Sequence, residues 1–365
     1  MTLYVNGRFL TQPVSGVQRY CLEVLGALDQ ILQRDRGRIG PVEVLVPRAV
    51  PAPPWQVLRA RVLSGGTGHI WEQGTLFHAT RGGPLVSLGN SGPLRHRAHI
   101  LCLHDANLFE IPEAFSPRYR VWHRMLRPML ARRAAVLLTV SRHSAQALSR
   151  HLHVDARRFE VVPNSAEHVL GWPSRDGVPA RYGLVPGAYL LSVGNQSPNK
   201  NIARLIQAHD NAGPKVPPLA IVGGAVPGLT STGTRQAERV HLLGRVPDAD
   251  LRGLYEGAAG FVFPSLYEGF GIPPLEAMQL GVPVLCARSG AMPEVLGPAP
   301  IWFDPRDPTD IARCLQAFAA MDAVQRRAQS VLGRSVAAQY RWATSAERLL
   351  NSVEQLTGQA RRRAA

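Results

Sequence analysis

The stretch Phe261-Val-Phe-Pro-Ser-Leu-Tyr-Glu-Gly-Phe-Gly-Ile-Pro-Pro-Leu-Glu276 decides the fold, because it predicts a buried strand, a glycine-rich bend and then a helix. Pro273 and Pro274 suit a first helical turn, where the N–H that proline lacks has no intrahelical partner. Gly269 and Gly271 leave the backbone of the bend uncovered. The N–H groups of the bend can therefore meet an oxyanion at the N-terminus of the helix.

Two carboxylates accompany this bend. Glu268 is expected on the bend itself and Glu276 in the first turn of the helix. A ligand that carries both phosphates and hydroxyls suits this pair, and nucleotide-sugars are such ligands. Two simpler interpretations stay open. Glu276 could serve only the positive end of its own helix, which contributes ~0.3–1 kcal/mol, and Glu268 could be a solvated loop acid.

Outward from this stretch, apolar runs alternate with helical patterns, as in βα repeats. The strands expected in the first half are 3–5, 42–46, 86–88, 98–103, 136–140 and 159–162. Those expected in the second half are 189–193, 219–222, 240–243, 260–264, 284–287 and 301–303. The sequence therefore predicts an α/β protein with two Rossmann-like, doubly wound domains. Ligands bind outside the carboxyl ends of such strands, so two domains in series predict a central cleft.

The length and the composition of the chain agree with two domains that each bury a hydrophobic core. The 365 residues exceed the usual size of one domain, and 45% of them are hydrophobic. The four cysteines are scattered without a C-x-x-C pair, which indicates neither a disulfide framework nor a zinc site. No apolar run approaches the ~18–20 residues that span a bilayer, and no leader is evident at the N-terminus. These features predict a cytoplasmic protein.

Besides the bend, several short motifs are spread over nearly the whole chain. They are Asn6-Gly-Arg, Gly16-Val-Gln-Arg-Tyr, Leu103-His-Asp, Thr139-Val-Ser, Val162-Pro-Asn, Val193-Gly-Asn, Pro198-Asn-Lys-Asn, Gly281-Val-Pro-Val and Ser289-Gly-Ala-Met-Pro-Glu-Val. Together with the two glutamates separated by seven residues, they resemble the retaining glycosyltransferases of family 4, whose architecture is called GT-B. Within that family the chain is similar to bacterial mannosyltransferases that build O-antigen or exopolysaccharide.

The resemblance implies a metal-independent, retaining transfer of a hexose. The first expectation is mannose from GDP-mannose, moved to an oligosaccharide or lipid-linked glycan in surface polysaccharide biosynthesis. Another hexosyl or deoxyhexosyl transfer from a UDP-, GDP- or dTDP-sugar is the alternative. The nucleotide-sugar is a co-substrate, and no further cofactor is expected. The implied division is an acceptor-side domain at 1–168, a linker at 169–186 and a nucleotide-sugar domain at 187–340. A helix and basic tail at 341–365 would return to the first domain.

The resemblance also assigns site residues. The catalytic residues are expected to be Glu268, His104 and Lys200, with Glu268 and His104 on the donor sugar and Lys200 on the diphosphate. The donor-binding residues are expected to be Gly16, Asn195, Val246, Gly269, Phe270, Gly271, Ile272 and Glu276. Asn195 departs from the family, which usually places a second cation there; Arg204 or a backbone N–H of the Gly16 loop could compensate. Lys200 is also one of only two lysines among 41 basic residues, which makes its position conspicuous.

The sequence offers three alternatives to a glycosyltransferase. A nucleotide-sugar epimerase on the same architecture is the nearest rival. A nucleic-acid-binding protein would need aromatic residues interleaved with clustered charge in a known module, and only 7% of the residues are aromatic. A nicotinamide site after the strand at 219–222 has the wrong glycine spacing in Ile221-Val-Gly-Gly-Ala-Val-Pro-Gly.

The net charge of +15 indicates anionic partners. Arg118, Arg120, Arg124, Arg127, Arg132 and Arg133 interleave with Tyr119, Trp122, Met125, Leu126 and Met129 at helical spacing. One interpretation is a surface helix with its apolar side in the core. The other is a contact with an anionic membrane surface, which would make the protein peripheral on the inner face of the cytoplasmic membrane.

Overall fold

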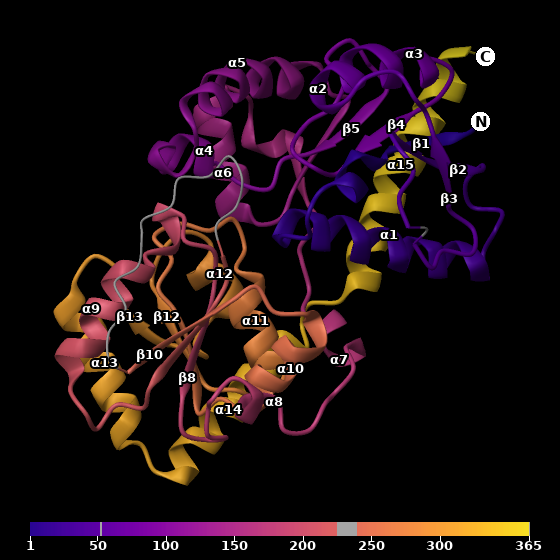
Figure 1. Ribbon diagram of the computed structural model, residues 1–365. Helices are drawn as coiled ribbons and strands as arrows, with labels where there is room; N and C mark the ends of the chain where they lie inside the picture. The colour runs from indigo at the N-terminus through magenta and orange to yellow at the C-terminus, as the bar shows by residue number, and fades with distance from the viewer. Residues whose placement is uncertain (52, 225–238, 365) are drawn as a thin grey trace. The chain divides into compact units, whose positions relative to one another are not determined.

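The computed structural model describes residues 1–51, 53–224 and 239–364, and the chain divides into two compact units (Figure 1). The first unit contains Met1–Ala106, Val121–Asn164 and Trp342–Ala365. The second unit contains Asn107–Arg120 and Ser165–Arg341. Each unit has one parallel sheet with helices, so the prediction of two Rossmann-like units is confirmed. No helix in the described part of the chain is long and apolar enough to cross a membrane.

The sheet of the first unit has seven strands in the order β3-β2-β1-β4-β5-β6-β7, all parallel. The strands are β1 (Leu3–Asn6), β2 (Val42–Val46), β3 (Arg59–Val62), β4 (Leu85–Ser87), β5 (His99–Cys102), β6 (Val136–Thr139) and β7 (Phe159–Val161). Strand β3 was not predicted. Its four residues, Arg-Ala-Arg-Val, are all exposed at the edge of the sheet, so they lack the apolar run of a buried strand.

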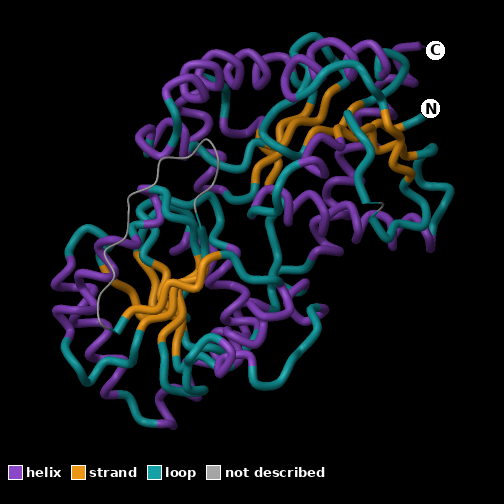
Figure 2. Tube along the Cα trace, viewed as in Figure 1, coloured by secondary structure: helices purple, strands orange, loops and turns teal. Residues whose placement is uncertain are grey.

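The sheet of the second unit has six strands in the order β10-β9-β8-β11-β12-β13. The strands are β8 (Leu190–Val193), β9 (Leu219–Val222), β10 (Val240–Gly244), β11 (Gly260–Phe263), β12 (Val284–Ala287) and β13 (Ile301–Phe303). Figure 2 shows these strands gathered into one layer with helices around them. The strand order reverses between β8 and β11, which is where an open α/β sheet binds its ligand.

Helices of the first unit cover its sheet. They are α1 (Gly16–Arg34), α2 (Gly68–Trp71), α3 (Phe77–Ala79), α5 (Pro117–Arg133, shared with the second unit), α6 (Arg142–Leu152) and α15 (Trp342–Ala364). Helix α15 packs along α1, and the rings of Tyr20 and Trp342 meet edge to face at 6.1 Å between centroids (Figure 1). Trp71 and Leu76 also form a hydrophobic cluster with Leu45 of β2 and Leu85 of β4.

Helices of the second unit cover both faces of its sheet. They are α4 (Asn107–Glu110), α7 (His168–Gly171), α8 (Val178–Arg181), α9 (Ile202–Ala212), α10 (Asp248–Glu256), α11 (Ile272–Gln279), α12 (Met292–Leu296), α13 (Pro308–Ala320) and α14 (Ala323–Ala337). The side chain of Val262 joins the core under α9 and α13. Its neighbour Phe261 faces the other way, as alternate strand residues do, and meets the ring of Tyr255 on α10 at 5.4 Å.

The segment expected to be a linker carries packed structure. Helices α7 and α8 both lie in it, and α8 contacts α10. A Cβ added at Gly253 of α10 would lie 2.7 Å from the Cβ of Val178, so the two helices approach closely there. Gly and Pro residues, which made the segment resemble a linker, here shape short helices against the second unit.

Helix α5 carries apolar side chains on two faces. Leu126 and Leu130 are buried, whereas the solvent face carries four large apolar side chains and three arginines. This exposed set, the α5 surface, consists of Val121, Trp122, Met125, Met129, Arg124, Arg132 and Arg133. Counting Arg127 in the basic face was wrong. Its side chain is 2% exposed, and its guanidinium donates to the carbonyl of Asp105 at 3.4 Å.

Candidate functional site

Two of the predicted site residues, Lys200 and Glu268, meet at the carboxyl edge of the second sheet. Lys200 follows β8 and Glu268 follows β11, and these two strands pair in parallel, Leu190 with Gly260 and Leu191 with Phe261. Nζ of Lys200 donates to Oε1 of Glu268 at 2.6 Å. Their side chains are 18% and 17% exposed, so the pair is sheltered but reachable from solvent.

Lys200 is held in place by apolar neighbours as well as by its ion pair. Its ammonium lies 5.3 Å from the ring centroid of Phe263, within the range of a cation–π contact. Its aliphatic stem passes close to Gly194, where an added Cβ would lie 3.4 Å from the stem. An ammonium has three N–H donors, so after the bond to Glu268 two remain to meet phosphate oxygens.

The loop between β8 and α9 is braced by its own polar side chains. Oδ1 of Asn195 accepts from the N–H and the hydroxyl of Ser197, at 3.3 and 2.5 Å. The loop also lies against Gly223, where an added Cβ would come within 2.0 Å of the Gly194 carbonyl oxygen. Asn195 therefore shapes the loop through its amide oxygen, a structural use that its position in the motif did not indicate.

The other cation near this loop is engaged with the framework. One guanidinium nitrogen of Arg204 donates to Oδ1 of Asn201 at 2.7 Å and to the carbonyl of Pro305 at 3.2 Å. Asn201 itself adopts a left-handed backbone (φ 57°) and donates to the carbonyls of Pro264 and Pro305. Arg204 thus links Asn201, the residue before α9, to Pro305, which follows β13.

The glycine bend before α11 is fixed by a neighbouring loop. The N–H of Ala291 donates to the Glu268 carbonyl at 3.0 Å. A Cβ added at Gly290 would lie 2.6 Å from that same oxygen, so glycine is required at this position. Gly271 ends the bend with φ 93°, and α11 begins at Ile272. Because Pro273 and Pro274 follow, Gly271 and Ile272 supply the N–H groups at the helix tip.

Phe270 turns away from the bend and stacks edge to face on Tyr340 at 5.3 Å. Val246, also expected to bind the donor, lies half-buried between β10 and α10. Of the glycine-rich stretch that follows β9, residues 225–228 lie outside the described residues.

Glu276 has a more specific environment than the sequence predicted. It is the fifth residue of α11 rather than part of the first turn, so the interpretation as a charge on the helix end is wrong. Nε2 of His168 donates to Oε1 and the hydroxyl of Tyr255 donates to Oε2, both at 2.8 Å. Burial and the nearby Glu276 charge raise the pKa of Tyr255 well above its usual value, so it stays a donor. Sequence reasoning missed both partners, because neither lies in a motif.

His104 and Gly16 belong to the first unit. His104 lies just after β5, and its Nε2 bonds the Leu88 carbonyl at 2.7 Å. Burial lowers the pKa of this imidazole, so the ring is neutral and Nε2 is the protonated nitrogen. Nδ1 is then an acceptor. Asn90, with φ 64°, accepts the His104 backbone N–H at 2.8 Å. Gly16 is exposed at the first position of α1.

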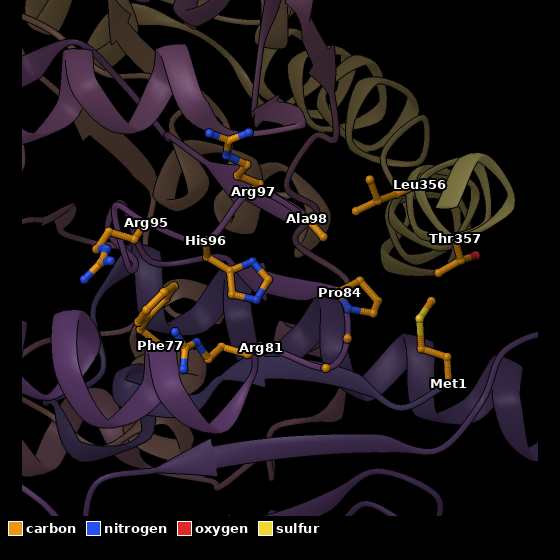
Figure 3. A pocket seen from close by; sticks show the side chains of 12 residues that line it. Met1, Phe77, Arg81, Pro84, Arg95, His96, Arg97, Ala98, Leu356 and Thr357 are labelled. Atoms are coloured by element: carbon orange, nitrogen blue, oxygen red, sulfur yellow. The ribbon is translucent and has the colours of Figure 1, made fainter. Parts of the chain in front are cut away.

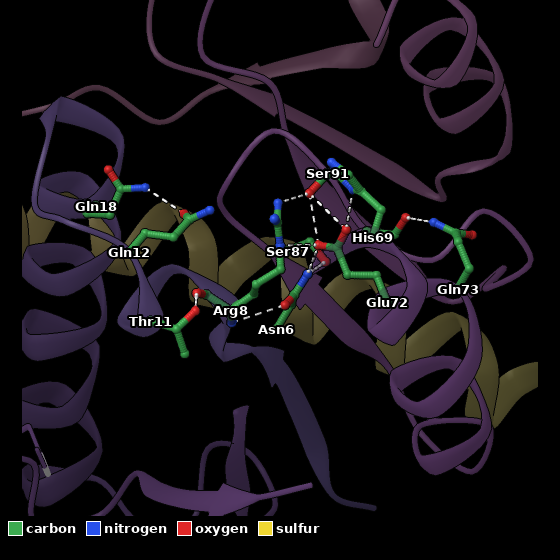
Figure 4. A network of polar contacts seen from close by, with 11 residues as sticks. Asn6, Arg8, Thr11, Gln12, Gln18, His69, Glu72, Gln73, Ser87 and Ser91 are labelled. Atoms are coloured by element: carbon green, nitrogen blue, oxygen red, sulfur yellow. Dashed lines mark hydrogen bonds and ion pairs between the residues drawn. The ribbon is translucent and has the colours of Figure 1, made fainter. Parts of the chain in front are cut away.

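A buried carboxylate organises the carboxyl edge of the first sheet, and the sequence did not single it out. Oε1 of Glu72 accepts from the Asn6 amide, the Arg8 guanidinium and the Ser91 hydroxyl at 2.8, 3.0 and 2.8 Å, and Oε2 accepts from His69 (Figure 4). Burial raises the pKa of Glu72, but these hydrogen bonds and the Arg8 charge outweigh it and lower the pKa to about 2. The network holds Arg8, the last residue of the Asn6-Gly-Arg motif, at this edge.

No group of three or more His, Cys, Asp or Glu side chains is arranged to hold a metal ion within the described residues.

Comparison with known proteins identifies the family. Residues 184–330 match the family described as glycosyl transferases group 1. O-antigen chain mannosyltransferase B of Escherichia coli is 33% identical over 285 residues, 72% of this chain and 72% of that protein. Serotype-specific mannosyltransferase WbdA of Escherichia coli is 30% identical over 59% of this chain, which spans only 28% of that longer protein.

The fold comparison agrees over the full length. The structure of Anabaena Alr3699/HepE in complex with UDP-glucose superposes with a TM-score of 0.71, over 97% of this chain and 99% of that one. At 16% identity this likeness shows the GT-B fold alone. The resemblance seen in the glutamate signature is thus confirmed, and the chain belongs to the group 1 glycosyltransferases, that is, to glycosyltransferase family 4.

Proposed function

We propose that the protein transfers mannose from GDP-mannose, with retention and without a metal ion, to a glycan acceptor of surface polysaccharide assembly. The observation that carries the proposal is the pair of Lys200 and Glu268, 2.6 Å apart where the strand order reverses. The choice of mannose is supported by relatives of this chain that are O-antigen chain mannosyltransferases.

The chain's own groups suit each need of this reaction. The Lys200 ammonium and the N–H groups at the tip of α11 would stabilise the diphosphate as its bond to the sugar breaks. The Glu268 carboxylate would meet the positive charge that develops on the sugar ring. The acceptor would attack from the side of the departing diphosphate, whose oxygen takes the acceptor proton, so this route needs no second carboxylate opposite Glu268.

Glu276 would hold the ribose of the donor. Nε2 of His168 bonds one of its oxygens and the Tyr255 hydroxyl bonds the other, so the carboxylate is held in one orientation in which it can accept from a ligand hydroxyl. His168 and Tyr255 act through Glu276, so they are positioning residues. Their fixed geometry lowers the conformational entropy that donor binding would otherwise cost.

The donor assignment is tested by nucleotide release. Purified protein with extracted lipid-linked glycans is expected to release GDP from GDP-mannose faster than from GDP-fucose, and faster than the corresponding nucleotide from UDP-glucose, UDP-N-acetylglucosamine or dTDP-rhamnose. EDTA is expected to leave the rate unchanged, because Lys200 and helix N–H groups carry the charge. Preference for another donor would overturn the mannose assignment. A strict requirement for Mg²⁺ or Mn²⁺ would overturn the metal-free mechanism.

Glu268→Gln keeps the size of the side chain and removes its charge. It is expected to lower kcat by roughly 10²-fold or more with little change in donor KM, because the lost contact belongs to the transition state. Lys200→Ala should be comparably damaging, and Lys200→Arg should recover only part of the rate. Lys215→Ala is the matched control, since Lys215 is the other lysine and lies exposed in the same unit. Near-normal kcat in Glu268→Gln would contradict this role.

Tyr255→Phe deletes only the hydroxyl that donates to Glu276. Because a hydrogen bond to a charged group contributes about 1.5–3 kcal/mol, donor KM is expected to rise roughly 10-fold or more while kcat stays within about twofold. His168→Gln, which keeps an N–H donor, should be milder than His168→Ala. Tyr189→Phe is the control, because that buried hydroxyl donates to the Leu254 carbonyl instead. Equal KM values for the two Phe variants would show that Tyr255 does not position Glu276.

We also propose that the α5 surface contacts an anionic membrane. Trp122 and Met125 are 45% and 62% exposed beside three arginines, and the chain carries a net charge of +15. Basic side chains near an anionic leaflet contribute about 1 kcal/mol each, and aromatic and apolar side chains suit the interface. A lipid-borne acceptor would lie at that same surface.

Vesicle sedimentation tests this contact. Binding is expected with phosphatidylglycerol vesicles and not with phosphatidylcholine vesicles, and it should fade by about 0.5 M NaCl because the Debye length falls well below its ~8 Å at physiological salt. Replacing Arg124, Arg132 and Arg133 with Gln should weaken binding without loss of turnover on a water-soluble acceptor. Replacing the exposed Arg36, Arg48 and Arg59 is the control of equal charge. Equal binding to both lipids would contradict the proposed membrane contact and would indicate that α5 is an ordinary surface helix.

A further inference from the structure

The first unit contains a pocket of about 400 Å³ that the donor chemistry does not use (Figure 3). It is lined by Met1, Phe77, Arg81, Gly82, Gly83, Pro84, Arg95, His96, Arg97, Ala98, Leu356 and Thr357. Pro84 directly precedes β4 and Ala98 directly precedes β5. The pocket therefore lies at the amino edge of the sheet, opposite the carboxyl edge where His104 and the Glu72 network lie.

Two guanidinium groups share one aromatic ring in this pocket. The Cζ atoms of Arg81 and Arg95 each lie 5.3 Å from the ring centroid of Phe77. Figure 3 shows both side chains reaching the ring, with His96 beside it. Stacking restricts the rotamers of the two arginines, so less entropy remains to be lost when a ligand binds.

The positive charge of the pocket has no counterpart in the described protein. None of the lining residues is acidic, and Arg81, Arg95 and Arg97 form no ion pair with any described carboxylate. His96 adds no charge, because burial lowers its pKa, and its Nε2 bonds the Thr80 carbonyl. Like charges held against one ring repel each other, and an anion bound between them would offset that repulsion.

Apart from the three arginines, His96 and the hydroxyl of Thr357, the side chains that line the pocket are apolar. Met1, Pro84 and Leu356 lie across the pocket from Phe77 and Arg95 in Figure 3. A ligand that fills the pocket would therefore be charged at one end and apolar at the other. Guanidinium groups recognise phosphate through paired N–H donors, which favours a phosphoryl group at the charged end.

We propose that this pocket binds a phosphate ester, with the phosphoryl group at Arg81 and Arg95 and the apolar alcohol portion against Met1 and Leu356. The proposal does not depend on the identity of the donor sugar. Such a ligand is a lipid phosphate or a small soluble phosphate, and the length of its alkyl part distinguishes the two sources.

Titration calorimetry on the full chain tests the pocket with three probes: hexyl phosphate, inorganic phosphate and hexanol. Hexyl phosphate is expected to bind at least about 10-fold more tightly than inorganic phosphate, because it adds apolar contact to the charge, and hexanol should not bind measurably. The double variant Arg81→Gln/Arg95→Gln should lose at least about 10-fold in hexyl phosphate affinity. Arg36→Gln/Arg59→Gln, which removes the same charge from exposed positions of the same unit, should change it less than about twofold.

Each outcome decides the proposal. Equal losses in the two double variants would mean that general charge binds the probe, and would overturn it. Unchanged affinity in Arg81→Gln/Arg95→Gln, or no hexyl phosphate binding at all, would also overturn it. Equal affinity for hexyl phosphate and inorganic phosphate would overturn the apolar half of the proposal, and loss of both only in that variant would limit the site to the phosphoryl group at Arg81 and Arg95. Donor turnover is measured in parallel, because the two variants should retain it whether or not mannose is the sugar transferred.

Discussion

The parallel pairing of β8 with β11 is the constraint on which the ion pair between Lys200 and Glu268 depends. These strands are far apart in the sequence, yet Leu190 pairs with Gly260 and Leu191 with Phe261. Their carboxyl ends therefore emerge together, and the loops that follow bring Lys200 and Glu268 to 2.6 Å. Gly260 permits the pairing, since an added Cβ would lie 2.6 Å from the ring of Phe318 in the core below.

Close backbone approach then shapes the edge of the sheet. Gly223 and Gly290 each stand where an added Cβ would collide with backbone, of Gly194 in one case and Glu268 in the other. These glycines let two loops pack closely, one against the loop between β8 and α9 and the other against the glycine bend before α11. The loops hold Lys200 and Glu268 without contributing chemistry themselves, so substitutions there would disturb the site through its geometry.

Buried carboxylates are stabilised differently in the two units. Glu72 is completely buried, and charged and neutral donors keep its pKa near 2. Glu276 is held by a tyrosine and a histidine, which orient it. Removing one partner of a buried carboxylate leaves charge uncompensated, and that cost fixes both arrangements. The first holds Arg8 at the edge of its sheet, and the second fixes the carboxylate on α11.

The sequence by itself determined twelve of the thirteen strands in the described part of the chain and the glycine bend before α11, because these depend on local patterns: apolar runs and the positions of glycine and proline. Only the tertiary structure decided that Glu276 is held by His168 and Tyr255, that Arg127 is buried, and that Arg81 and Arg95 share the ring of Phe77. Exposed β3 likewise forms only because β2 offers it an edge. Each of these features depends on residues distant along the chain, and a local pattern carries no information about which distant side chains will meet.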